Sequence, residues 1–254
     1  MPIATLVIVT GASRGLGRAL AAQYLAEGAF VLGLARQSSA ELRPSGAGGL
    51  EQWQVDLADP LPVAARLGAW LADVERRAGG QLPARVRVIH NAALLAEPAD
   101  IADSDPGELA RSLRVGLEAP VALTAAFLRA TAPWTAADRR VLFVSSGLGR
   151  RALGGNGAYC AQKAGLDHFA RALALEEGAR PHGARVASVA PGIVDTDMQR
   201  QLRGADPKRF AAQPQFDDWH RSGALDSPAT AAAKVIALLE RADYGDNPVT
   251  DVRG

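Results

Sequence analysis

Short runs of hydrophobic and often β-branched residues recur along the chain, and longer segments with helical spacing separate them. Each run is short enough to form a strand that is buried on both faces, and residues 50–55 form a weaker candidate. The stronger strand candidates are residues 3–9, 30–34, 86–89, 141–144 and 186–189. The helix candidates, which are rich in Ala and Leu, are residues 18–27, 63–77, 108–130, 159–177 and 229–241. This alternation predicts right-handed βαβ crossovers and an α/β fold, a doubly wound parallel sheet with helices on both faces.

One compact domain is expected for the whole chain, residues 1–254. A chain of this length with 48% hydrophobic residues can bury a single large core, and no shift in composition marks a domain boundary. The stretch rich in Ser, Gly and Pro at residues 37–49 predicts a loop. Residues 197–225 mix charged residues and proline with large apolar side chains. That mixture favours a substrate-binding lid, and two ordinary surface helices are the alternative.

The charge balance gives the chain no strong electrostatic attraction to polyanions. It carries 28 basic and 27 acidic residues, so we expect neither nucleic acid nor an anionic membrane as a partner. No apolar stretch approaches the roughly 18 to 20 residues that span a bilayer, and the first strand candidate begins without the basic leader of a signal peptide. Cys160 is the only cysteine, which excludes an internal disulfide, and the four histidines show no metal-ligand spacing. These features predict a cytoplasmic protein without a bound metal.

A glycine-rich segment follows the first predicted strand and opens the first predicted helix. It has the sequence TGASRGLG over residues 10–17. The glycines permit a tight turn, close approach of the backbone to a pyrophosphate and close packing of helix on strand. The helix N-terminus adds free N–H groups and the positive end of a dipole. The segment is interpreted as a dinucleotide cradle, with a turn that simply needs glycine as the alternative. The cradle residues are Gly11, Ser13, Arg14, Gly15, Leu16 and Gly17.

An arginine stands where dinucleotide-binding folds that prefer NAD place an acidic residue. The second predicted strand ends at Arg36, and an acid at this point would accept hydrogen bonds from the adenosine ribose. Arg36 at the strand end and Arg14 in the cradle could instead bind a phosphate on the 2′-oxygen of that ribose from two sides. The predicted cofactor is therefore NADP(H), and two solvated surface arginines are the alternative.

Two further strand ends supply candidate cofactor contacts. Asp56 and Leu57 follow the weaker strand candidate, where the Asp56 carboxylate either lies near the adenine amino group or caps a helix. Asn91 and Ala92 follow the next strand, where small residues leave room for a cofactor and Asn91 could brace adjoining backbone. A plain turn at the strand end is the alternative for the second pair.

Tyr159 and Lys163 are four residues apart at the start of a predicted helix, so their side chains project from the same face. A free phenol has a pKa of about 10, and a nearby ammonium stabilises its phenolate, so the pair makes a usable general acid/base. Ser146 lies just past the strand at residues 141–144, where its hydroxyl could hydrogen-bond a substrate carbonyl. Because ligands bind at the carboxyl ends of parallel strands, we expect these residues to converge with the cradle on one crevice.

Taken together, these motifs resemble those of the short-chain dehydrogenase/reductase family over nearly the whole chain. The matching segments are residues 10–17, residues 91–93, Ser146 with Tyr159 and Lys163, and residues 191–196, which have the sequence PGIVDT. The resemblance implies a Rossmann-type fold and hydride transfer between a nicotinamide and a carbonyl or alcohol carbon. Within the family, residues 31–36, 159–163 and 195–198 look most similar to the sepiapterin reductase and benzil reductase group.

The resemblance implies a role for each matching residue. Tyr159 would exchange the proton, Lys163 would lower the phenol pKa and bind the nicotinamide ribose, and Ser146 would orient the substrate oxygen. The catalytic residues would therefore be Ser146, Tyr159 and Lys163, of which the last two also contact the cofactor. Thr196 and the Ile193 backbone would meet the nicotinamide end of the cofactor, and Pro191 and Gly192 are also expected to bind the cofactor.

The chain departs from the family pattern at two places. Many members carry a catalytic asparagine that helps to hold a relay water near the lysine, and the matching position here is Gly116. Glycine leaves space, so we expect backbone-bound water to serve the lysine, with chemistry that is weakened and that Gly116→Asn improves. His90 and Ala93 replace the first asparagine and the glycine of the family's Asn-Asn-Ala-Gly motif, a change that is not expected to exclude the cofactor.

The activity expected from these features is NADPH-dependent reduction of a small-molecule carbonyl substrate. Ketones and 1,2-diketones, including aromatic and pterin-like compounds, are the expected range. A 3-oxoacyl-thioester reductase is a second reading, and the lack of an obvious basic patch for an acidic carrier protein counts against it. A third alternative is a catalytically weak NADP-binding protein that acts as a sensor or binds a partner. The resemblance also implies a homodimer or homotetramer formed through the helices at residues 108–130 and 159–177.

Overall fold

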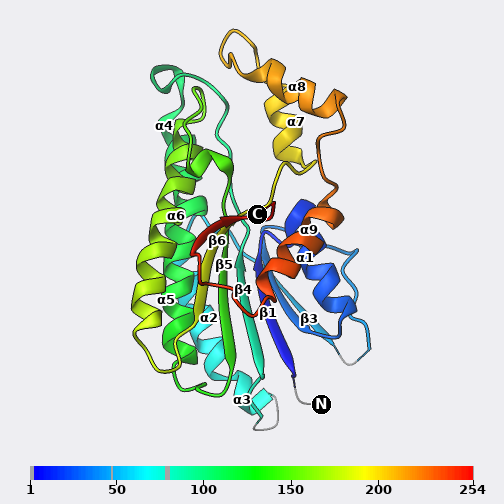
Figure 1. Cartoon of the computed structure of the whole chain (residues 1–254), viewed down its shortest axis with the longest axis vertical. Helices are drawn as coiled ribbons and strands as arrows, with labels where there is room; N and C mark the ends of the chain where they lie inside the picture. Colours follow the sequence, from blue (N-terminus) through cyan, green and yellow to red (C-terminus); the bar gives the residue numbers. More distant parts are fainter. Residues whose placement is uncertain (1–2, 47, 78–80, 254) are drawn as a thin grey trace.

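A seven-stranded parallel sheet forms the centre of the molecule (Figure 1), in the order β3-β2-β1-β4-β5-β6-β7. The structure is a computed structural model and describes residues 3–46, 48–77 and 81–253. The order reverses between β1 and β4, which opens a crevice at the carboxyl ends of these two strands. The strands are β1 (Thr5–Thr10), β2 (Phe30–Ala35), β3 (Gly49–Gln54), β4 (Arg85–His90), β5 (Asp138–Val144), β6 (Arg185–Ala190) and β7 (Val249–Asp251).

Helices cover both faces of this sheet, as the alternating hydrophobic pattern predicts. In Figure 1, α2, α5 and α6 lie on one side of the sheet, and α1 and α9 lie on the other. Two large clusters of buried apolar side chains fill the spaces between the sheet and these helix layers. The predicted doubly wound α/β fold is confirmed. The helices are α1 (Gly15–Ala26), α2 (Pro60–Ala72), α3 (Val74–Arg77), α4 (Pro106–Leu113), α5 (Ala119–Thr131), α6 (Gly157–Gly178), α7 (Asp197–Arg203), α8 (Gln213–Arg221) and α9 (Pro228–Leu239).

Three elements differ from the sequence prediction. The strand β7 is missed because its three residues are too short to show a periodic pattern. The single helix predicted at residues 108–130 is divided into α4 and α5 by a π-helical turn, Arg114–Glu118. The helix predicted at residues 63–77 ends early, and the short helix α3 follows it. No helix within the described residues combines the length and hydrophobicity needed to cross a membrane.

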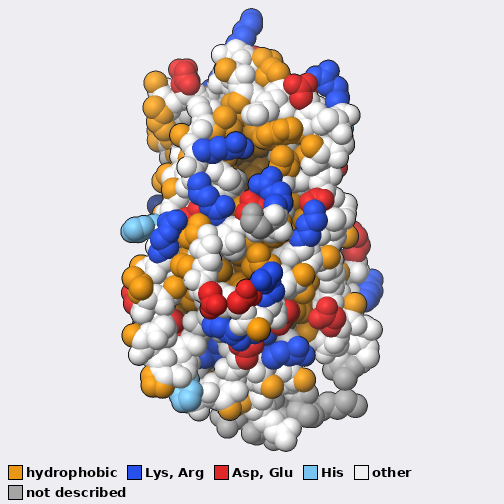
Figure 2. Space-filling view, viewed as in Figure 1, with side chains coloured by type: hydrophobic (Ala, Val, Ile, Leu, Met, Phe, Trp, Pro, Cys, Tyr) orange, Lys and Arg blue, Asp and Glu red, His pale blue; other side chains and the backbone are white. Residues whose placement is uncertain are grey.

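The segment predicted as a lid lies beyond the carboxyl ends of the strands. Figure 1 shows α7 and α8 at the top of the molecule, above the sheet. Between them lies a small apolar cluster in which Phe210 and Phe216 are buried. In Figure 2, hydrophobic side chains line a hollow near the top of the molecule, and Lys and Arg side chains gather below it. The segment therefore contains two helices that pack on each other over the crevice.

A buried cluster of charges fastens the sheet to α9. Arg87 on β4 is fully buried. Its Nε and Nη2 atoms donate to the two carboxylate oxygens of Glu240, at 2.8 and 2.7 Å. Nη2 also donates to the Asp138 carboxylate at 2.9 Å, and Arg140 and Arg185 bond to the same carboxylate. A buried charge is tolerated only when it is paired in this way, so loss of one partner should destabilise the fold.

We predict that Asp138 stabilises the protein above about pH 4. Partial burial opposes ionisation, but hydrogen bonds and charge from Arg140, Arg87 and Arg185 outweigh it and lower the pKa of Asp138 to about 2. A lowered folded-state pKa adds stability above the unfolded pKa, and this stability is lost as the pH falls toward 2. Urea unfolding should show that Asp138→Asn lowers the free energy of unfolding by about 2 kcal/mol at pH 7.

The same difference between wild type and Asp138→Asn should shrink as the pH falls below about 4. Asp103→Asn, at an exposed position outside this cluster, is the matched control and should change little. A difference that does not depend on pH would contradict this account of the cluster.

Candidate active site

A cavity of about 810 Å³ opens at the carboxyl ends of β1, β4, β5 and β6, and residues of α7 and α8 complete its wall. Its volume lies within the range of small-molecule and cofactor sites. The structure brings every predicted catalytic and cofactor residue to this cavity except Gly17, which lies behind the cradle. The predicted residues that line it are Gly11, Ser13, Arg14, Gly15, Leu16, Arg36, Asp56, Leu57, Asn91, Ala92, Ser146, Tyr159, Lys163, Pro191, Gly192, Ile193 and Thr196.

The glycine cradle has the backbone geometry that a bound pyrophosphate needs. Gly11 and Gly15 have φ angles of 70° and 53°, which disfavour any residue with a Cβ atom. A Cβ atom on Gly17 would overlap the carbonyl oxygen of Gly11, so this glycine lets α1 pack closely on β1. Arg14 precedes α1 and makes no side-chain capping bond to a described residue, so the first N–H groups of α1 can receive an anion. The cradle therefore fits a dinucleotide.

Asn91 holds the cradle in place from the neighbouring strand. Its Nδ2 donates to the Thr10 carbonyl at 3.0 Å. The Thr10 hydroxyl in turn accepts from the backbone N–H groups of Asn91 and Ala92, each at 3.0 Å. These bonds join the carboxyl ends of β1 and β4 across the crevice, which is the bracing contact expected from the sequence.

The two arginines predicted to grip a 2′-phosphate both line the cavity, in different surroundings. Arg36 is exposed at the end of β2. Arg14 donates from Nη1 to the Asp197 carboxylate of α7 at 2.8 Å, and the two side chains are 64% and 46% exposed. An ion pair this exposed contributes little stability. The Arg14 guanidinium could therefore leave Asp197 and bind a phosphate with little loss of free energy.

Asp56 lines the cavity without capping a helix. Its Oδ1 accepts from the backbone N–H of Ala58 at 3.0 Å, and its Oδ2 pairs with Arg111 of α4 at 2.6 Å. Asp59 occupies the N-cap position of α2. Hydrogen bonding to Ala58, together with Arg111 and Arg36, holds the pKa of Asp56 below its usual value. Asp56 is therefore an ionised carboxylate at the cavity wall.

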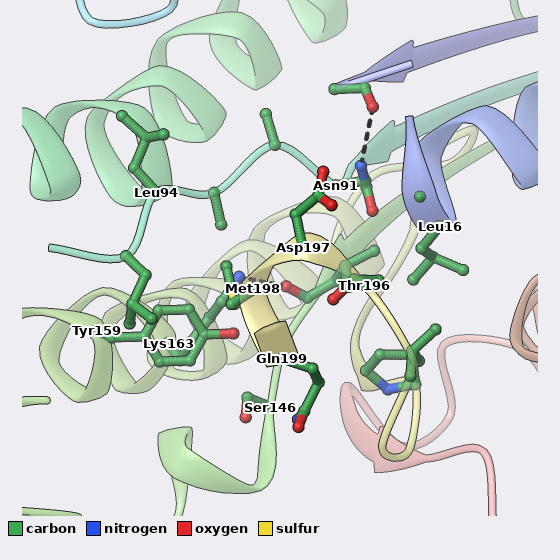
Figure 3. Close-up of a pocket in the computed structure, with 18 of the residues that line it drawn as sticks. Leu16, Asn91, Leu94, Ser146, Tyr159, Lys163, Thr196, Asp197, Met198 and Gln199 are labelled. Atoms are coloured by element: carbon green, nitrogen blue, oxygen red, sulfur yellow. Dashed lines mark hydrogen bonds between the residues drawn. The ribbon is translucent and has the colours of Figure 1, made fainter. Parts of the chain in front are cut away.

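Tyr159, Lys163 and Ser146 meet at the floor of the cavity (Figure 3). Lys163 is buried, and its Nζ donates to the Val144 carbonyl at the end of β5, at 2.7 Å. The same Nζ lies 5.5 Å from the centre of the Tyr159 ring. Ser146 Oγ accepts from the Leu148 N–H at 3.2 Å, which leaves its own O–H available to donate. The site thus offers a phenol, an ammonium and a hydroxyl around one space.

Burial shifts the pKa values of the pair in opposite directions. It raises the pKa of Tyr159 to about 12, partly offset by the nearby Ser146 hydroxyl. It lowers the pKa of Lys163 to about 8, partly offset by the charge of Asp167. The phenol pKa is thus raised and not lowered in this structure, because loss of water around the phenol outweighs the hydrogen bond with Ser146. The Tyr159 phenol is therefore protonated across the neutral range.

A model of the family described as short chain dehydrogenase matches residues 5–207 of this sequence. The chain belongs to the short-chain dehydrogenase/reductase family. It is 30% identical over 250 residues to the benzil reductase ((S)-benzoin forming) of Bacillus cereus, an alignment that covers 96% of this chain and 97% of the relative. It is 34% identical over 248 residues to the sepiapterin reductase of Meriones unguiculatus, covering 92% and 90% of the two chains. The resemblance inferred from the motifs is confirmed, and the protein is an oxidoreductase.

Solved structures of the same family share its architecture. A crystal structure of a protein from Beutenbergia cavernae, which holds NADP at low occupancy, superposes with a TM-score of 0.78 at 27% identity. The superposition covers 98% of this chain and 95% of the other. Members of the short-chain dehydrogenase/reductase family use NAD(P)(H), and the cradle described above is the part of this chain that fits such a dinucleotide.

The family asparagine position does not have the open space expected for Gly116. Gly116 is buried within the π-helical turn. A Cβ atom there would overlap the Oε1 and Cδ atoms of Gln162. The expectation that glycine leaves room for water at this position is wrong, because the Gln162 side chain from α6 fills that room. An asparagine at position 116 could enter only if Gln162 moved away.

The second departure from the short-chain dehydrogenase/reductase pattern belongs to the core. His90 is buried, stacks on Phe143 with ring centres 5.1 Å apart, and shares a 2.9 Å hydrogen bond with the Thr124 hydroxyl. Burial lowers the pKa of His90 to about 3, so its ring is neutral. Ala93 lines the cavity. The substitution at position 90 thus replaces one hydrogen-bonding side chain by another beneath the cavity floor.

Several cavity or supporting residues were not singled out from the sequence. Asp167 is buried, accepts bonds from Ser145 and Ser188 at 2.6 and 2.7 Å, and ties β5 and β6 to α6. Asn156 lines the cavity, and neither polar atom of its amide has a partner among the described residues. Sequence spacing could have suggested Asp167, which is four residues after Lys163, but nothing local marks Asn156.

Proposed function

We propose that this protein uses NADPH to reduce a carbonyl substrate to an alcohol, with Tyr159 as the general acid. The observation that carries the proposal is the convergence of Ser146, Tyr159 and Lys163 with the glycine cradle on one cavity. Benzil reductase and sepiapterin reductase, the relatives named above, are both reductases, which supports this direction. A silent NADP-binding protein would have no need of the phenol, ammonium and hydroxyl around one space.

Ser146, Tyr159 and Lys163 at the base of the cavity each have a different role in the proposed proton transfer. Ser146 donates its O–H to the substrate oxygen and fixes the carbonyl beside Tyr159. Tyr159, protonated at neutral pH, transfers its phenol proton to that oxygen as negative charge develops there. Lys163, held on the Val144 carbonyl, stabilises the phenolate that remains. NADPH, when bound, supplies the hydride that reduces the carbonyl carbon.

The cofactor preference rests on the charges at the adenosine end of the cavity. Arg36 at the end of β2 and Arg14 in the cradle present two guanidinium groups, where an acidic residue would favour an unphosphorylated ribose. Arg14 can exchange its exposed contact with Asp197 for a phosphate. These features support NADPH over NADH.

The substrate end of the cavity is mainly apolar. Leucine, methionine and aromatic side chains form its wall, and they support ketones or 1,2-diketones with an aromatic or other bulky group. We further propose that α7 and α8 act as the lid, because they carry much of this wall and contact the cradle through the Asp197–Arg14 pair. The apolar wall residues are Leu94, Leu95, Leu148, Leu153, Met198, Leu202, Phe216 and Trp219.

The test is a measurement of NADPH consumption with aromatic ketones, 1,2-diketones, pterins and 3-oxoacyl thioesters, with NADH in parallel. We expect turnover of at least one ketone or diketone with NADPH. Preference for the acyl thioesters would instead support a 3-oxoacyl-thioester reductase. Tight NADPH binding without turnover of any compound would contradict the proposed function and favour a binding role.

A further inference from the structure

Gln162 lies between Tyr159 and Lys163 on α6, and none of the steps above uses it. Its side chain is fully buried. Its Nε2 donates to the Leu94 carbonyl at 3.1 Å and to the Ser112 hydroxyl at 2.9 Å. The Ser112 hydroxyl donates to the same carbonyl at 2.7 Å. One carboxamide thus connects α6 to α4 and to the segment that follows β4.

Lys163 fastens the same turn of α6 to a different strand. Its ammonium bonds to the Val144 carbonyl at the end of β5, and β5 is the neighbour of β4 in the sheet. Two consecutive side chains therefore hold the turn that carries Tyr159 against the ends of two adjacent strands. Gln162 supplies the contact on the β4 side, where residues 91–95 line the cavity.

Gly116 provides the space that this side chain occupies. The Leu94 carbonyl can only accept a hydrogen bond, which points Nε2 of Gln162 toward Leu94 and Oε1 toward Gly116. A Cβ atom at position 116 would lie well inside the 3.0 Å that real Cβ atoms keep from other heavy atoms. Because Gly116 is buried in the π-helical turn, an added side chain cannot turn outward. Gln162 and Gly116 are therefore complementary in shape.

We propose that Gln162, seated on Gly116, is a positioning residue that docks the Tyr159–Lys163 turn of α6 onto the segment after β4. Its effect on catalysis rests on the proposed function, whereas the docking itself does not. Without the amide, α6 loses its hydrogen bond to the β4 side and Tyr159 can shift relative to the bound reactants. A displacement of about 1 Å can cost about a hundredfold in rate, so a smaller shift should still be measurable.

The first test is Gln162→Met, which keeps the length of the side chain and removes the amide. We expect kcat with the best ketone substrate to fall by about tenfold, while KM for NADPH stays within about threefold. In hydrogen–deuterium exchange, peptides covering residues 91–95 should exchange faster. The matched control is Gln23→Met, since Gln23 also donates to a backbone carbonyl, that of Ala229 at 2.8 Å, but lies outside the cavity. The control should leave kcat and exchange at residues 91–95 unchanged.

The second test is a double-mutant cycle with Gly116→Ala and Gln162→Ala. In the presence of Gln162, the added methyl group should displace the amide and lower kcat by about tenfold. In the Gln162→Ala background, the same methyl group should change kcat by less than about twofold, because the overlapping atoms are gone. Independent effects of the two substitutions would overturn the pairing.

The outcomes for docking and for function are separable. If Gln162→Met leaves both kcat and exchange at residues 91–95 unchanged, the positioning role is overturned. If that variant does not fold, the cycle with Gln162→Ala decides between coupled and independent effects. If the wild type reduces none of the compounds, the proposed function fails. The docking can then still be tested by hydrogen exchange and by a double-mutant cycle in which the Tm values of the same Gly116 and Gln162 variants replace kcat. Unchanged exchange at residues 91–95 and independent effects on Tm would overturn the docking.

Discussion

Tyr159→Phe is expected to lower kcat for ketone reduction by a factor of about 100 to 10,000, the usual contribution of a general acid. The substitution removes one oxygen atom and leaves the ring, whose face lies 5.5 Å from the Lys163 ammonium. The cradle and Arg36 are unchanged, so the Kd of NADPH should stay within about threefold. The measurement is single-turnover reduction with the best substrate, together with NADPH binding by fluorescence.

The reason for this large effect is that, in the proposed reaction, the phenol is the acid beside the substrate oxygen. The Ser146 hydroxyl accepts a hydrogen bond from the Leu148 N–H and is a much weaker acid than a phenol. With wild type, kcat should fall as the pH rises through about 8, because Lys163 then loses the charge that stabilises the phenolate. Tyr159→Phe turnover within about tenfold of wild type would show that another group, such as bound water, delivers the proton.

Replacement of Arg14 and Arg36 together by alanine is expected to lower the ratio of kcat/KM with NADPH to kcat/KM with NADH by about 100-fold. Each hydrogen bond between a guanidinium and a phosphate contributes about 1.5–3 kcal/mol, and NADH lacks that phosphate. Activity with NADH should change much less, which distinguishes loss of phosphate recognition from general damage. Steady-state kinetics with both cofactors at a fixed substrate concentration gives the ratio.

The single variants should show which arginine carries the preference. Arg36→Ala is expected to have the larger effect, because Arg14 must first leave Asp197 before it can bind a phosphate. Arg171→Ala, on the exposed face of α6 and outside the cavity, is the matched control. A ratio that is unchanged in the double variant would mean that both residues are solvated surface arginines.

The fold follows from a pattern that is visible along the chain. Runs such as residues 141–144 are hydrophobic at every position, as expected for a strand buried on both faces, and helical segments separate them. Parallel strands then bring their carboxyl ends to one edge, so the cradle, Asn91 and Ser146 could be predicted to meet. The position of Tyr159 and Lys163 on one face of α6 was predictable from their spacing, because side chains four residues apart lie about one turn apart on a helix.

Contacts between distant segments could not be predicted in this way. The buried cluster of Arg87 joins residues that are 51 and 153 positions apart, and the pairing of Arg14 with Asp197 spans 183 positions. The pKa of Tyr159 depends on how completely the folded chain shields the phenol from water, and the residues around position 159 in the sequence do not show this. Such quantities depend on three-dimensional packing.

Gly116 shows most clearly the difference between features that could be predicted from the sequence and those that depend on packing. The family, the alternation of strands and helices and the lack of an asparagine at this position could all be inferred from residue identity and spacing. The side chain that fills the space beside Gly116 became visible only in the fold, because Gln162 reaches it from another helix, 46 positions further along the chain, counted from 116 to 162. Local spacing predicts neighbours on one element, whereas the packing of two helices decides which side chain occupies the space between them.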